Sequence, residues 1–454
     1  MILVTDSILL GLSGAFALFY IYYYVRYMAG VQRRVRHQKH HRFRWKTSSP
    51  EEENSQLSTR NDCSERSEEK NFQLSTRSDR SERSEEKNFP LSTHSDRSER
   101  SEEKNFQLSK PGVSVIVCAR NEADNLQHYL QALCCQKYPT FEVIVVNDGS
   151  EDQTQTVLEH YTQLFRNLRL TFVPNEAWVR SSKKLALTLA AKAAKYDYLL
   201  LTDADCRPES PYWIDEMMSG FCEPETEVVI GYGGYFEEPK GINKLIQYDT
   251  ITSAMTYLGF ALTGHPYMGV GRNLAYKKDT FFAHRGFAGQ LGQRAGDDDL
   301  FVNKVANRHN TEVVITPNSF TWSVPKHSYA EWRIQKYRHL SVSPAYRFAT
   351  KLRLSIEPTI RGLWYMLMIA VGVLAYLGIV TTPIVWGTAL ALFVARLVWL
   401  NILVNRAARI FGVTNLRVCK FTVLQTLFYD IFLPVFNLCM LIRHAFRRNQ
   451  EQHW

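Results

Sequence analysis

The sequence predicts an α/β domain with a mainly parallel sheet, flanked by apolar helices near both ends of the chain. Three apolar runs have the length and composition of buried strands, and they are residues 114–118, 141–147 and 196–202. Stretches with the apolar spacing of helices separate these runs, and strands that alternate with helices favour a parallel sheet. Long apolar stretches near the N-terminus and after residue 358 predict attachment to a membrane.

The first segment, residues 1–29, is predicted to be a membrane anchor. Residues 8–25 form an apolar run of about the length that a bilayer requires, and no small-residue cleavage site marks a removable signal peptide. Basic residues follow this run closely: Arg26, Arg33, Arg34, Arg36, Lys39, Arg42, Arg44 and Lys46. Because basic residues favour the cytoplasmic side, we expect the N-terminus outside and the remaining chain inside.

Residues 30–110 are predicted to contain this basic juxtamembrane stretch and then a disordered tether. A unit of 17 residues, as in NFQLSTRSDRSERSEEK, occurs three times between residues 54 and 104. The unit offers one Phe and one Leu, which is too little apolar surface to bury a core. We therefore expect the repeats to connect the anchor to the ordered domain without carrying chemistry.

Polar side chains follow each of the three predicted strands. Arg120 and Glu122 come after the first strand, Asp148 after the second, and Asp203 and Asp205 after the third. In parallel α/β sheets, ligands bind beyond the carboxyl ends of the strands. Three such strand ends in one domain indicate a nucleotide site.

Asp203 and Asp205 lie two positions apart, at the end of a predicted buried strand. Carboxylates in this arrangement can reach one hard cation, Mg²⁺ or Mn²⁺, while the cation holds a diphosphate. The cation would neutralise the charge that grows on a departing nucleoside diphosphate. Such a pair is more often a solvated loop or a helix cap, but acidic residues at a buried strand end are costly unless something binds them.

Three further groups each have two interpretations. Asp148 either caps the following helix or accepts hydrogen bonds from a base or ribose. Lys183 and Lys184, at the start of a predicted helix, either form a solvated pair or reach a phosphate. Asp297, Asp298 and Asp299 either begin a helix, or one of them, its pKa raised by its neighbours, removes a proton from an acceptor hydroxyl.

The C-terminal region, residues 346–454, is predicted to lie in or on the membrane. Residues 362–380 and 384–404 are each long and apolar enough to span a bilayer. Residues 421–442 carry basic flanks on both sides, which favours an interfacial or re-entrant segment over a third span.

Polar residues mark the border and the interior of this membrane region. Residues 327–340 mix aromatic and basic side chains and predict an interface helix, on which Gln335 and Arg338 face the diphosphate of a donor. Arg396 and Asp430 lie within the apolar segments, where charges are expensive. They either pair with each other or Arg396 extends to the cytoplasmic face, and we favour the second arrangement.

Residues 111–345 resemble the family 2 glycosyltransferases, whose catalytic domain has a GT-A fold. Six segments carry the resemblance, and in order they are VCARNE, VVNDGSEDQT, Lys183 with a following Ala-Leu, TDADC, GVGRNLAY and GDDDL. Any one match is modest, whereas six in a suitable order are hard to obtain by chance. The resemblance implies a Rossmann-like GT-A domain between N- and C-terminal transmembrane helices.

The resemblance also implies a role for each matching residue. The donor side would contain Ala119, Arg120, Glu122, Asp148, Lys183 and Asp203. A divalent cation would be bound by Asp205, with Asp203 as a ribose or second metal contact. The acceptor side would be lined by Gly271, Arg272 and Asn273.

Two departures from the family pattern affect these roles. The family's acidic pair is usually Glu-Asp, whereas this chain has three aspartates, so the catalytic base is Asp298 or Asp297. We favour Asp298, because an acidic residue then precedes the base, although the spacing to Leu300 favours Asp297. His339 stands where members that polymerise sugars carry the Trp that stacks on the acceptor, which argues against processive synthesis.

The expected function is inverting, metal-dependent transfer of a sugar from a nucleoside diphosphate sugar, UDP-linked by preference, to a lipid-linked or glycan acceptor. We expect an integral protein of the inner membrane of a bacterium, with its catalytic domain in the cytoplasm. Much of the net charge of +9 lies beside the apolar spans, so membrane lipid is the expected anionic partner and nucleic acid is not. The alternatives are a processive polysaccharide synthase and a catalytically inactive, membrane-anchored nucleotide-binding scaffold.

Overall fold

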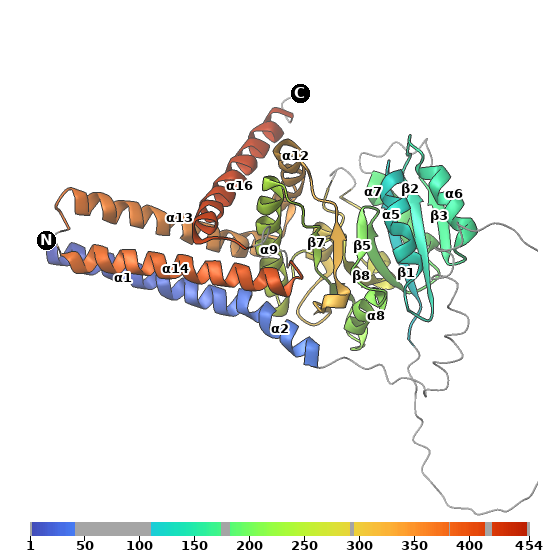
Figure 1. Ribbon diagram of the computed structural model, residues 1–454, viewed down its shortest axis with the longest axis horizontal. Helices are drawn as coiled ribbons and strands as arrows, with labels where there is room; N and C mark the ends of the chain where they lie inside the picture. The colour runs from blue at the N-terminus through green and yellow to red at the C-terminus, as the bar shows by residue number, and fades with distance from the viewer. Residues whose placement is uncertain are drawn as a thin grey trace, which may run out of the picture. The chain divides into compact units, whose positions relative to one another are not determined.

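The computed structural model describes residues 2–40, 110–173, 182–290, 295–380, 382–413 and 420–451. The 17-residue repeats, and with them the predicted tether, lie outside the described residues. Apart from residue 110, the described residues belong to one compact unit. It consists of an α/β domain and a set of long helices formed by both ends of the chain (Figure 1).

In the described part of the chain, a seven-stranded sheet with the order β3-β2-β1-β4-β8-β6-β9 forms the centre of the domain. Its strands are β1 (Val113–Ala119), β2 (Phe141–Asn147), β3 (Leu168–Phe172), β4 (Tyr198–Asp203), β6 (Val228–Ile230), β8 (Leu274–Lys277) and β9 (Thr311–Val313). Strand β8 runs antiparallel to both of its neighbours and the other pairs are parallel. The predicted α/β fold with a mainly parallel sheet is confirmed.

Helices cover both faces of this sheet. They are α5 (Ala123–Cys134), α6 (Thr154–Leu164), α7 (Ser182–Ala193), α8 (Trp213–Met218), α9 (Gly241–Leu262), α10 (Lys278–Ala283), α11 (Asp299–Val305) and α12 (Tyr329–Leu340). Because side chains alternate along a strand, β1 contributes to two cores. Ile116 packs in the cluster that contains Ala190 of α7, and Val115 in the one that contains Leu130 of α5.

A smaller sheet stands beside the carboxyl end of β4. Among the residues described, it has three strands, β5 (Cys206–Pro208), β10 (Thr321–Ser323) and β7 (Gly233–Tyr235), in that order. Strand β10 pairs with β5 in antiparallel and with β7 in parallel orientation. The sheet therefore brings segments that are distant in the sequence to the turn that follows Asp203.

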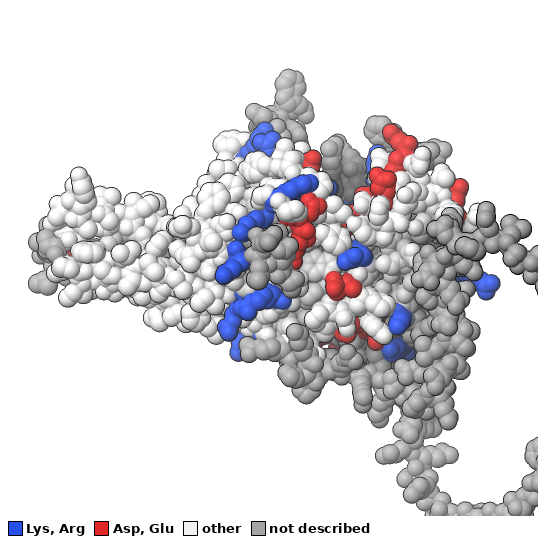
Figure 2. Space-filling model, viewed as in Figure 1, with Lys and Arg blue, Asp and Glu red and all other residues white. Residues whose placement is uncertain are grey.

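Within the described ranges, four helical segments are long and apolar enough to cross a membrane. They are α1 (Ile2–Tyr23) with its continuation through a π-helix (Tyr24–Met28), α13 (Phe348–Tyr376), α14 (Pro383–Ile410) and α16 (Val423–Glu451). Charged side chains are almost absent from the face of these helices in view, and Lys and Arg gather where the helices meet the domain (Figure 2). This distribution fits a membrane-bound protein.

Helix α16 differs from the other three segments in its direction. It is continuous over 29 residues and is inclined to α1 and α14, which run alongside each other (Figure 1). A helix of this length is compatible with the interfacial placement predicted for residues 421–442 and also with a third C-terminal span.

The basic stretch after the first span is part of the folded unit. It continues as α2 (Ala29–His40), and Arg34 forms an ion pair with Glu312 over 2.6 Å. The buried Gln38 amide donates to the carbonyl of Val313 (2.8 Å) and accepts from the N–H of Ile315 (3.0 Å). The start of the predicted juxtamembrane stretch thus packs as a helix against the edge of the sheet next to β9.

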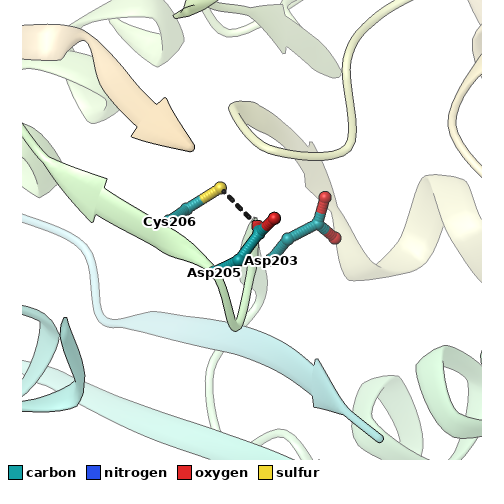
Figure 3. A group of neighbouring side chains, drawn as sticks. All are labelled: Asp203, Asp205 and Cys206. Atoms are coloured by element: carbon teal, nitrogen blue, oxygen red, sulfur yellow. Dashed lines mark hydrogen bonds between the residues drawn. The ribbon is translucent and has the colours of Figure 1, made fainter. Parts of the chain in front are cut away.

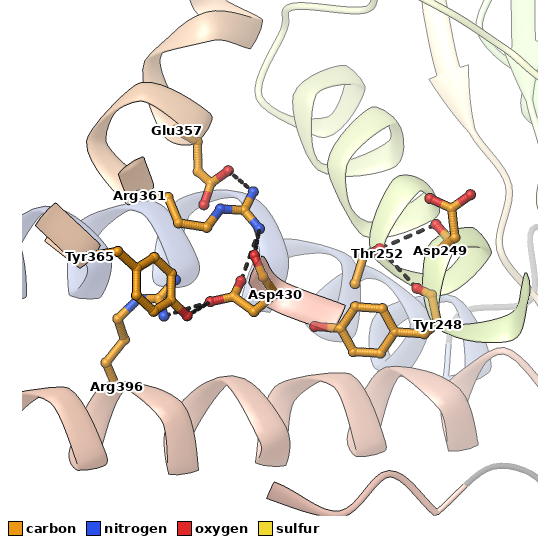
Figure 4. A network of polar contacts seen from close by, with 8 residues as sticks. All are labelled: Tyr248, Asp249, Thr252, Glu357, Arg361, Tyr365, Arg396 and Asp430. Atoms are coloured by element: carbon orange, nitrogen blue, oxygen red, sulfur yellow. Dashed lines mark hydrogen bonds and ion pairs between the residues drawn. The ribbon is translucent and has the colours of Figure 1, made fainter. Parts of the chain in front are cut away.

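Helices α13, α14 and α16 meet at a cluster of charged side chains (Figure 4). The Asp430 carboxylate of α16 accepts hydrogen bonds from Arg396 of α14 (2.8 Å) and from Arg361 and Tyr365 of α13 (2.9 and 2.7 Å). Arg361 also pairs with Glu357 one turn away. Arg396 is only 7% exposed, so the preferred arrangement, in which it extends to the cytoplasmic face, is wrong: a buried partner is available and offsets the cost of its charge.

We predict that Asp430→Asn lowers the stability of the helix bundle strongly. The substitution leaves Arg396 and one arm of Arg361 without a counter-charge, and loss of one partner of a buried ion pair costs about 3–5 kcal/mol. The measurement is the thermal midpoint of the protein in detergent micelles. Tyr365→Phe is the control, since it removes one neutral donor at a cost of about 1 kcal/mol; equal shifts for both variants would contradict the prediction.

Candidate active site

Lys183, in the first turn of α7, connects the two acidic motifs. Its ammonium nitrogen lies 2.9 Å from Oδ1 of Asp203 and 3.2 Å from Oδ2 of Asp297. Burial on its own would raise the pKa of Asp203, but Lys183, with help from Arg272 and Arg338, lowers that pKa below its usual value. Asp203 is therefore ionised at neutral pH. The ammonium group of Lys183 is shared by Asp203 at the end of β4 and Asp297 in the loop before α11.

Asp205 follows in the turn between β4 and β5 (Figure 3). Its Oδ2 accepts a hydrogen bond from the hydroxyl of Ser323 on β10 (2.8 Å), and its Oδ1 accepts one from the thiol of Cys206 (3.3 Å). One ligand atom from each of Asp203, Asp205 and Cys206 lies within 4.8 Å of the others. Burial and the two carboxylates raise the pKa of the Cys206 thiol.

The donor set at this turn fits a hard divalent cation. Mg²⁺ and Mn²⁺ prefer carboxylate oxygens, which Asp203 and Asp205 supply, whereas the thiol of Cys206 is protonated and donates to Asp205. Ser323 fixes the direction of the Asp205 carboxylate, as partners of metal ligands commonly do. The two aspartates are thus the residues that would hold a cation.

The ends of β1 and β2 lie at the same edge of the sheet. The carbonyl of Ala119 accepts a hydrogen bond from the N–H of Asp148 (2.9 Å), and Asp148 is buried. Gly149 follows with a φ of +63°, which glycine adopts without strain. Glu122 stands at the start of α5, where burial, Asp205 and Asp203 raise its pKa; Arg120, in contrast, is exposed.

The acidic triplet at the start of α11 gives each carboxylate a different partner. Asp297 faces Lys183. Asp298 accepts hydrogen bonds from the N–H groups of Gly271 (2.7 Å) and Asp299 (2.9 Å), and Asp299 accepts one from the hydroxyl of Tyr346 (3.2 Å).

The surroundings raise the pKa of Asp298 and of Asp299. Burial and the neighbouring Asp297 raise the pKa of Asp298 to about 6, against the opposing effect of Lys183. Burial and Asp298 raise the pKa of Asp299 well above its usual value, which favours the neutral form of this group. The triplet therefore begins a helix and also contains a carboxyl group of raised pKa, as both interpretations required.

In the acceptor-side segment before β8, Arg272 and Asn273 have different roles. The Arg272 guanidinium stacks on the ring of Tyr235 (4.2 Å to its centre) and donates to the carbonyl of Gly234 (3.0 Å). It lies close enough to Asp203 and Asp205 for their charges to raise its pKa. Arg272 thus stands between the metal motif and the open side of the site.

Asn273, the next residue, is fully buried. Its amide donates to the carbonyls of Tyr232 (2.8 Å) and Ser319 (2.6 Å) and accepts from the indole of Trp213 (3.0 Å). These bonds hold three segments together behind the site, so the amide of Asn273 positions Arg272 and offers no free atom to an acceptor.

Helix α12 closes one side of the site. The amide of Gln335 donates to the hydroxyl of Tyr235 (2.9 Å). The charge of Arg338 contributes to the lowered pKa of Asp203, which places the guanidinium on the side of the metal motif. Ser328 caps the helix by accepting a hydrogen bond from the N–H of Glu331 (3.2 Å).

Several residues of the site were not predicted from the sequence. Ser323 lies in a three-residue strand without a recognisable motif, and Tyr235 supports both Arg272 and Gln335 from another short strand. Lys184 is fully buried and donates to the carbonyls of Gln290 and Ala295 (2.9 and 3.0 Å), in the segment that leads to the acidic triplet. The pair Lys183 and Lys184 in the sequence was the signal from which a role for Lys184 could have been predicted.

Residues 114–290 match the family described as Glycosyl transferase family 2. Over 145 residues the chain is 28% identical to Glycosyltransferase AglE from Haloferax volcanii, which covers 32% of this chain and 46% of that protein. Over 107 residues it is 31% identical to a Poly-beta-1,6-N-acetyl-D-glucosamine synthase from Staphylococcus epidermidis, which covers 23% of this chain and 25% of that protein.

The structure of the mannosyltransferase PcManGT from Pyrobaculum calidifontis, solved with GDP-Man and Mn²⁺, is 22% identical to this chain with a TM-score of 0.45, and covers 68% of this chain and 88% of that one. The alignments span less than half the length of the two curated relatives. The family match includes β1, β2 and β4 and stops before the acidic triplet. Between residues 114 and 290 the chain thus carries a domain of glycosyl transferase family 2.

Proposed function

We propose that the chain is an inverting, metal-dependent glycosyltransferase that moves a sugar from a nucleoside diphosphate sugar, preferably UDP-linked, to a lipid-linked or glycan acceptor at the cytoplasmic face of a membrane. The contact of Lys183 with both Asp203 and Asp297 carries this proposal. This contact joins the candidate metal ligand Asp203 to the acidic triplet that contains the candidate base, which supports transfer between a donor and an acceptor in one site.

The donor side is formed by the carboxyl ends of β1, β2 and β4. Asp148 and Glu122 border the nucleoside, and Asp203 and Asp205 would hold Mg²⁺ or Mn²⁺. When bound, the cation supplies positive charge to the departing diphosphate. Lys183 provides a second positive charge within reach of the same diphosphate, since it already lies against Asp203.

The proton of the attacking hydroxyl goes to Asp298. A carboxyl group with a pKa of about 6 is ionised at neutral pH and is a better proton acceptor than an unperturbed one. Its contact with the N–H of Gly271 directs it toward the acceptor-side segment, whereas Asp297 faces Lys183 on the donor side. We therefore keep Asp298 as the base and assign Asp297 to holding the lysine.

We further propose that each acceptor receives one or a few sugars. A curated relative is named as a polysaccharide synthase, but His339 replaces the Trp of the polymerising members. Imidazole offers a smaller stacking surface to an acceptor sugar than indole does. A growing chain is therefore held less firmly between additions.

The proposed function is tested by offering a panel of nucleoside diphosphate sugars, with Mn²⁺ or Mg²⁺, to membranes that contain the full chain. Mass spectrometry of the extracted lipids and glycans would show a mass increase of one or a few sugar residues with one donor. Long ladders of product would favour a processive synthase. Tight binding of UDP without transfer from any donor would favour an inactive scaffold.

Asp205→Asn is predicted to impair cation binding. Loss of a ligand oxygen should raise the Mn²⁺ concentration for half-maximal transfer by at least about tenfold, since even the outer partners of metal ligands contribute this much. The measurement is a titration of transfer against Mn²⁺. Asp279→Asn, which removes an exposed carboxylate in α10, should leave the titration curve in place; normal transfer by Asp205→Asn at every Mn²⁺ concentration would overturn the metal assignment.

Transfer should rise with pH through about 6, because only the ionised Asp298 accepts a proton. Below this pH the group is protonated and the turnover number falls; above it the turnover number is constant. Asp298→Asn should remove this pH dependence and lower the turnover number by a factor on the order of 10²–10⁴.

Asp297→Asn is the matched variant for this experiment. It should keep a rise with pH, displaced to below pH 6 because the charge of Asp297 no longer raises the pKa of Asp298, and it should weaken the binding of the donor, measured as the KM for the nucleotide sugar. The reverse assignment of effects, with the pH dependence lost in Asp297→Asn and retained in Asp298→Asn, would identify Asp297 as the base.

A further inference from the structure

A large cavity connects the candidate active site with the membrane helices. Its volume is about 1140 Å³, and helices α9, α12, α13 and α16 and the end of the first span contribute to its wall. From the domain it is lined by Arg272, Asp299, Gln335 and His339, and from the membrane helices by Leu400 of α14 and Leu433, Leu438 and Leu441 of α16. The cavity thus combines polar side chains beside the catalytic groups with apolar side chains of the helices.

The charged side chains of the cavity wall are largely balanced by one another. Lys336 donates to both carboxylate oxygens of Asp249 (2.7 and 2.8 Å). Arg361 is paired with Glu357 and with Asp430 (Figure 4). Each of these cations already has a carboxylate partner, so this part of the wall has little affinity for an anion.

Two further cations line the cavity. Arg272 lies near the metal motif, whose aspartates balance its charge. Lys351 is exposed and donates to the carbonyl of Pro344 (3.3 Å), a contact that leaves its positive charge in place. Burial and Asp298 raise the pKa of Asp299 well above the usual value, which favours its neutral form.

The wall also offers neutral polar atoms to a ligand. Oδ1 of Asp299 and Oδ1 of Asn437 are buried and have no hydrogen-bond partner among the described residues. The residue Asp299 is only 4% exposed. Buried polar atoms without partners are costly, and a hydroxyl group in the cavity can satisfy the oxygen of Asp299 next to the candidate base.

We propose that this cavity binds a neutral lipid with a free hydroxyl group, of the diacylglycerol or ceramide type, as the acceptor of the sugar. This inference rests on the proposed function and specifies its acceptor. The hydroxyl lies near Asp298 and Asp299, and the acyl chains lie along the leucines of α16. A lipid phosphate is disfavoured, because Lys336 and Arg361 of the cavity wall are already paired with carboxylates.

The apolar part of the wall argues for a lipid rather than a glycan chain. Sugar hydroxyls placed against Leu433 and Leu441 would lose their hydrogen bonds to water without replacement. Leu438 lines the cavity and is also 59% exposed on α16, so the cavity opens toward the lipid-facing surface of that helix. The volume of about 1140 Å³ lies somewhat above the range of ordinary ligand pockets and accommodates more than a sugar.

The transfer step follows from this placement. The lipid hydroxyl oxygen forms a bond to the anomeric carbon of the donor, while the bond from that carbon to the diphosphate oxygen breaks. The nucleoside diphosphate leaves with the electron pair, and Asp298 takes the hydroxyl proton. The products are a glycosyl lipid with inverted configuration, the nucleoside diphosphate and one proton.

Photolabelling tests the lipid site independently of catalysis. The full chain is placed in phosphatidylcholine nanodiscs with a dioleoylglycerol analogue that carries a diazirine in one acyl chain, or with the corresponding phosphatidic acid. After illumination, labelled peptides are identified by mass spectrometry. We expect the neutral probe to label peptides of α16 and α9 about tenfold more than the phosphatidic acid, since a buried charge without a partner is strongly disfavoured.

Two tryptophan variants of α16 provide a matched comparison. Leu438→Trp fills part of the cavity and should lower labelling by the neutral probe about tenfold, because overpacking excludes the acyl chain. Val435→Trp lies on the same helix at a similarly exposed position that does not line the cavity, and it should label like the unmodified chain. Equal labelling of all three proteins, or equal labelling by both probes, would overturn the inference.

Transfer assays separate this inference from the proposed function. The same nanodiscs receive the panel of nucleotide sugars, and both glycosyl-dioleoylglycerol and released nucleoside diphosphate are measured. Specific labelling of the cavity without transfer from any donor would refute the proposed function and leave the lipid site intact. Transfer to a soluble glycan or to the phosphatidic acid, with dioleoylglycerol unmodified, would refute the neutral lipid as acceptor.

Discussion

The arrangement of the site depends on the ammonium group of Lys183 between Asp203 and Asp297. Three half-buried charges at one sheet edge are stable together because the cation reduces the repulsion between the carboxylates. Helix α7 delivers the lysine from one face of the sheet, β4 delivers Asp203, and the loop before α11 delivers Asp297. The local sequence of the two acidic motifs does not require them to lie close together. Their common contact with Lys183 connects them.

Three aspartates in a row differ because their neighbours differ. Gly296 has a φ of +84°, a conformation that side-chain-bearing residues rarely adopt, and this turn directs Asp297 toward Lys183. The following residue then meets the backbone N–H of Gly271, and Asp299 turns inward to Tyr346. One carboxylate is therefore paired with a lysine, one is hydrogen-bonded to the backbone and one accepts from a tyrosine hydroxyl, although the residue type is the same in each case.

Local sequence was sufficient to predict the elements that carry the donor side. Helix α5 begins and ends where its apolar periodicity does, and Asp148 and Asp203 were found because a buried strand stops at a polar residue. Ser323, Tyr235 and the docking of Gln38 beside β9 could not be predicted, since each depends on contacts between distant segments. The pairing of Arg396 with Asp430 could not be predicted for the same reason. The sequence shows both charged residues but not the distance between them.

The membrane helices and the catalytic domain both contribute to the wall of the cavity, and this limits where an acceptor can enter. Helix α9 packs against the π-helix that ends the first span and also lines the cavity, while α12 contributes both Gln335 at the site and Lys336 at the cavity. The charge cluster around Asp430 holds α13, α14 and α16 together at the opposite wall. An acceptor that reaches Asp298 from this side must therefore pass between a polar helix of the domain and apolar helices of the membrane region, and a molecule with one polar and one apolar end matches both surfaces at once.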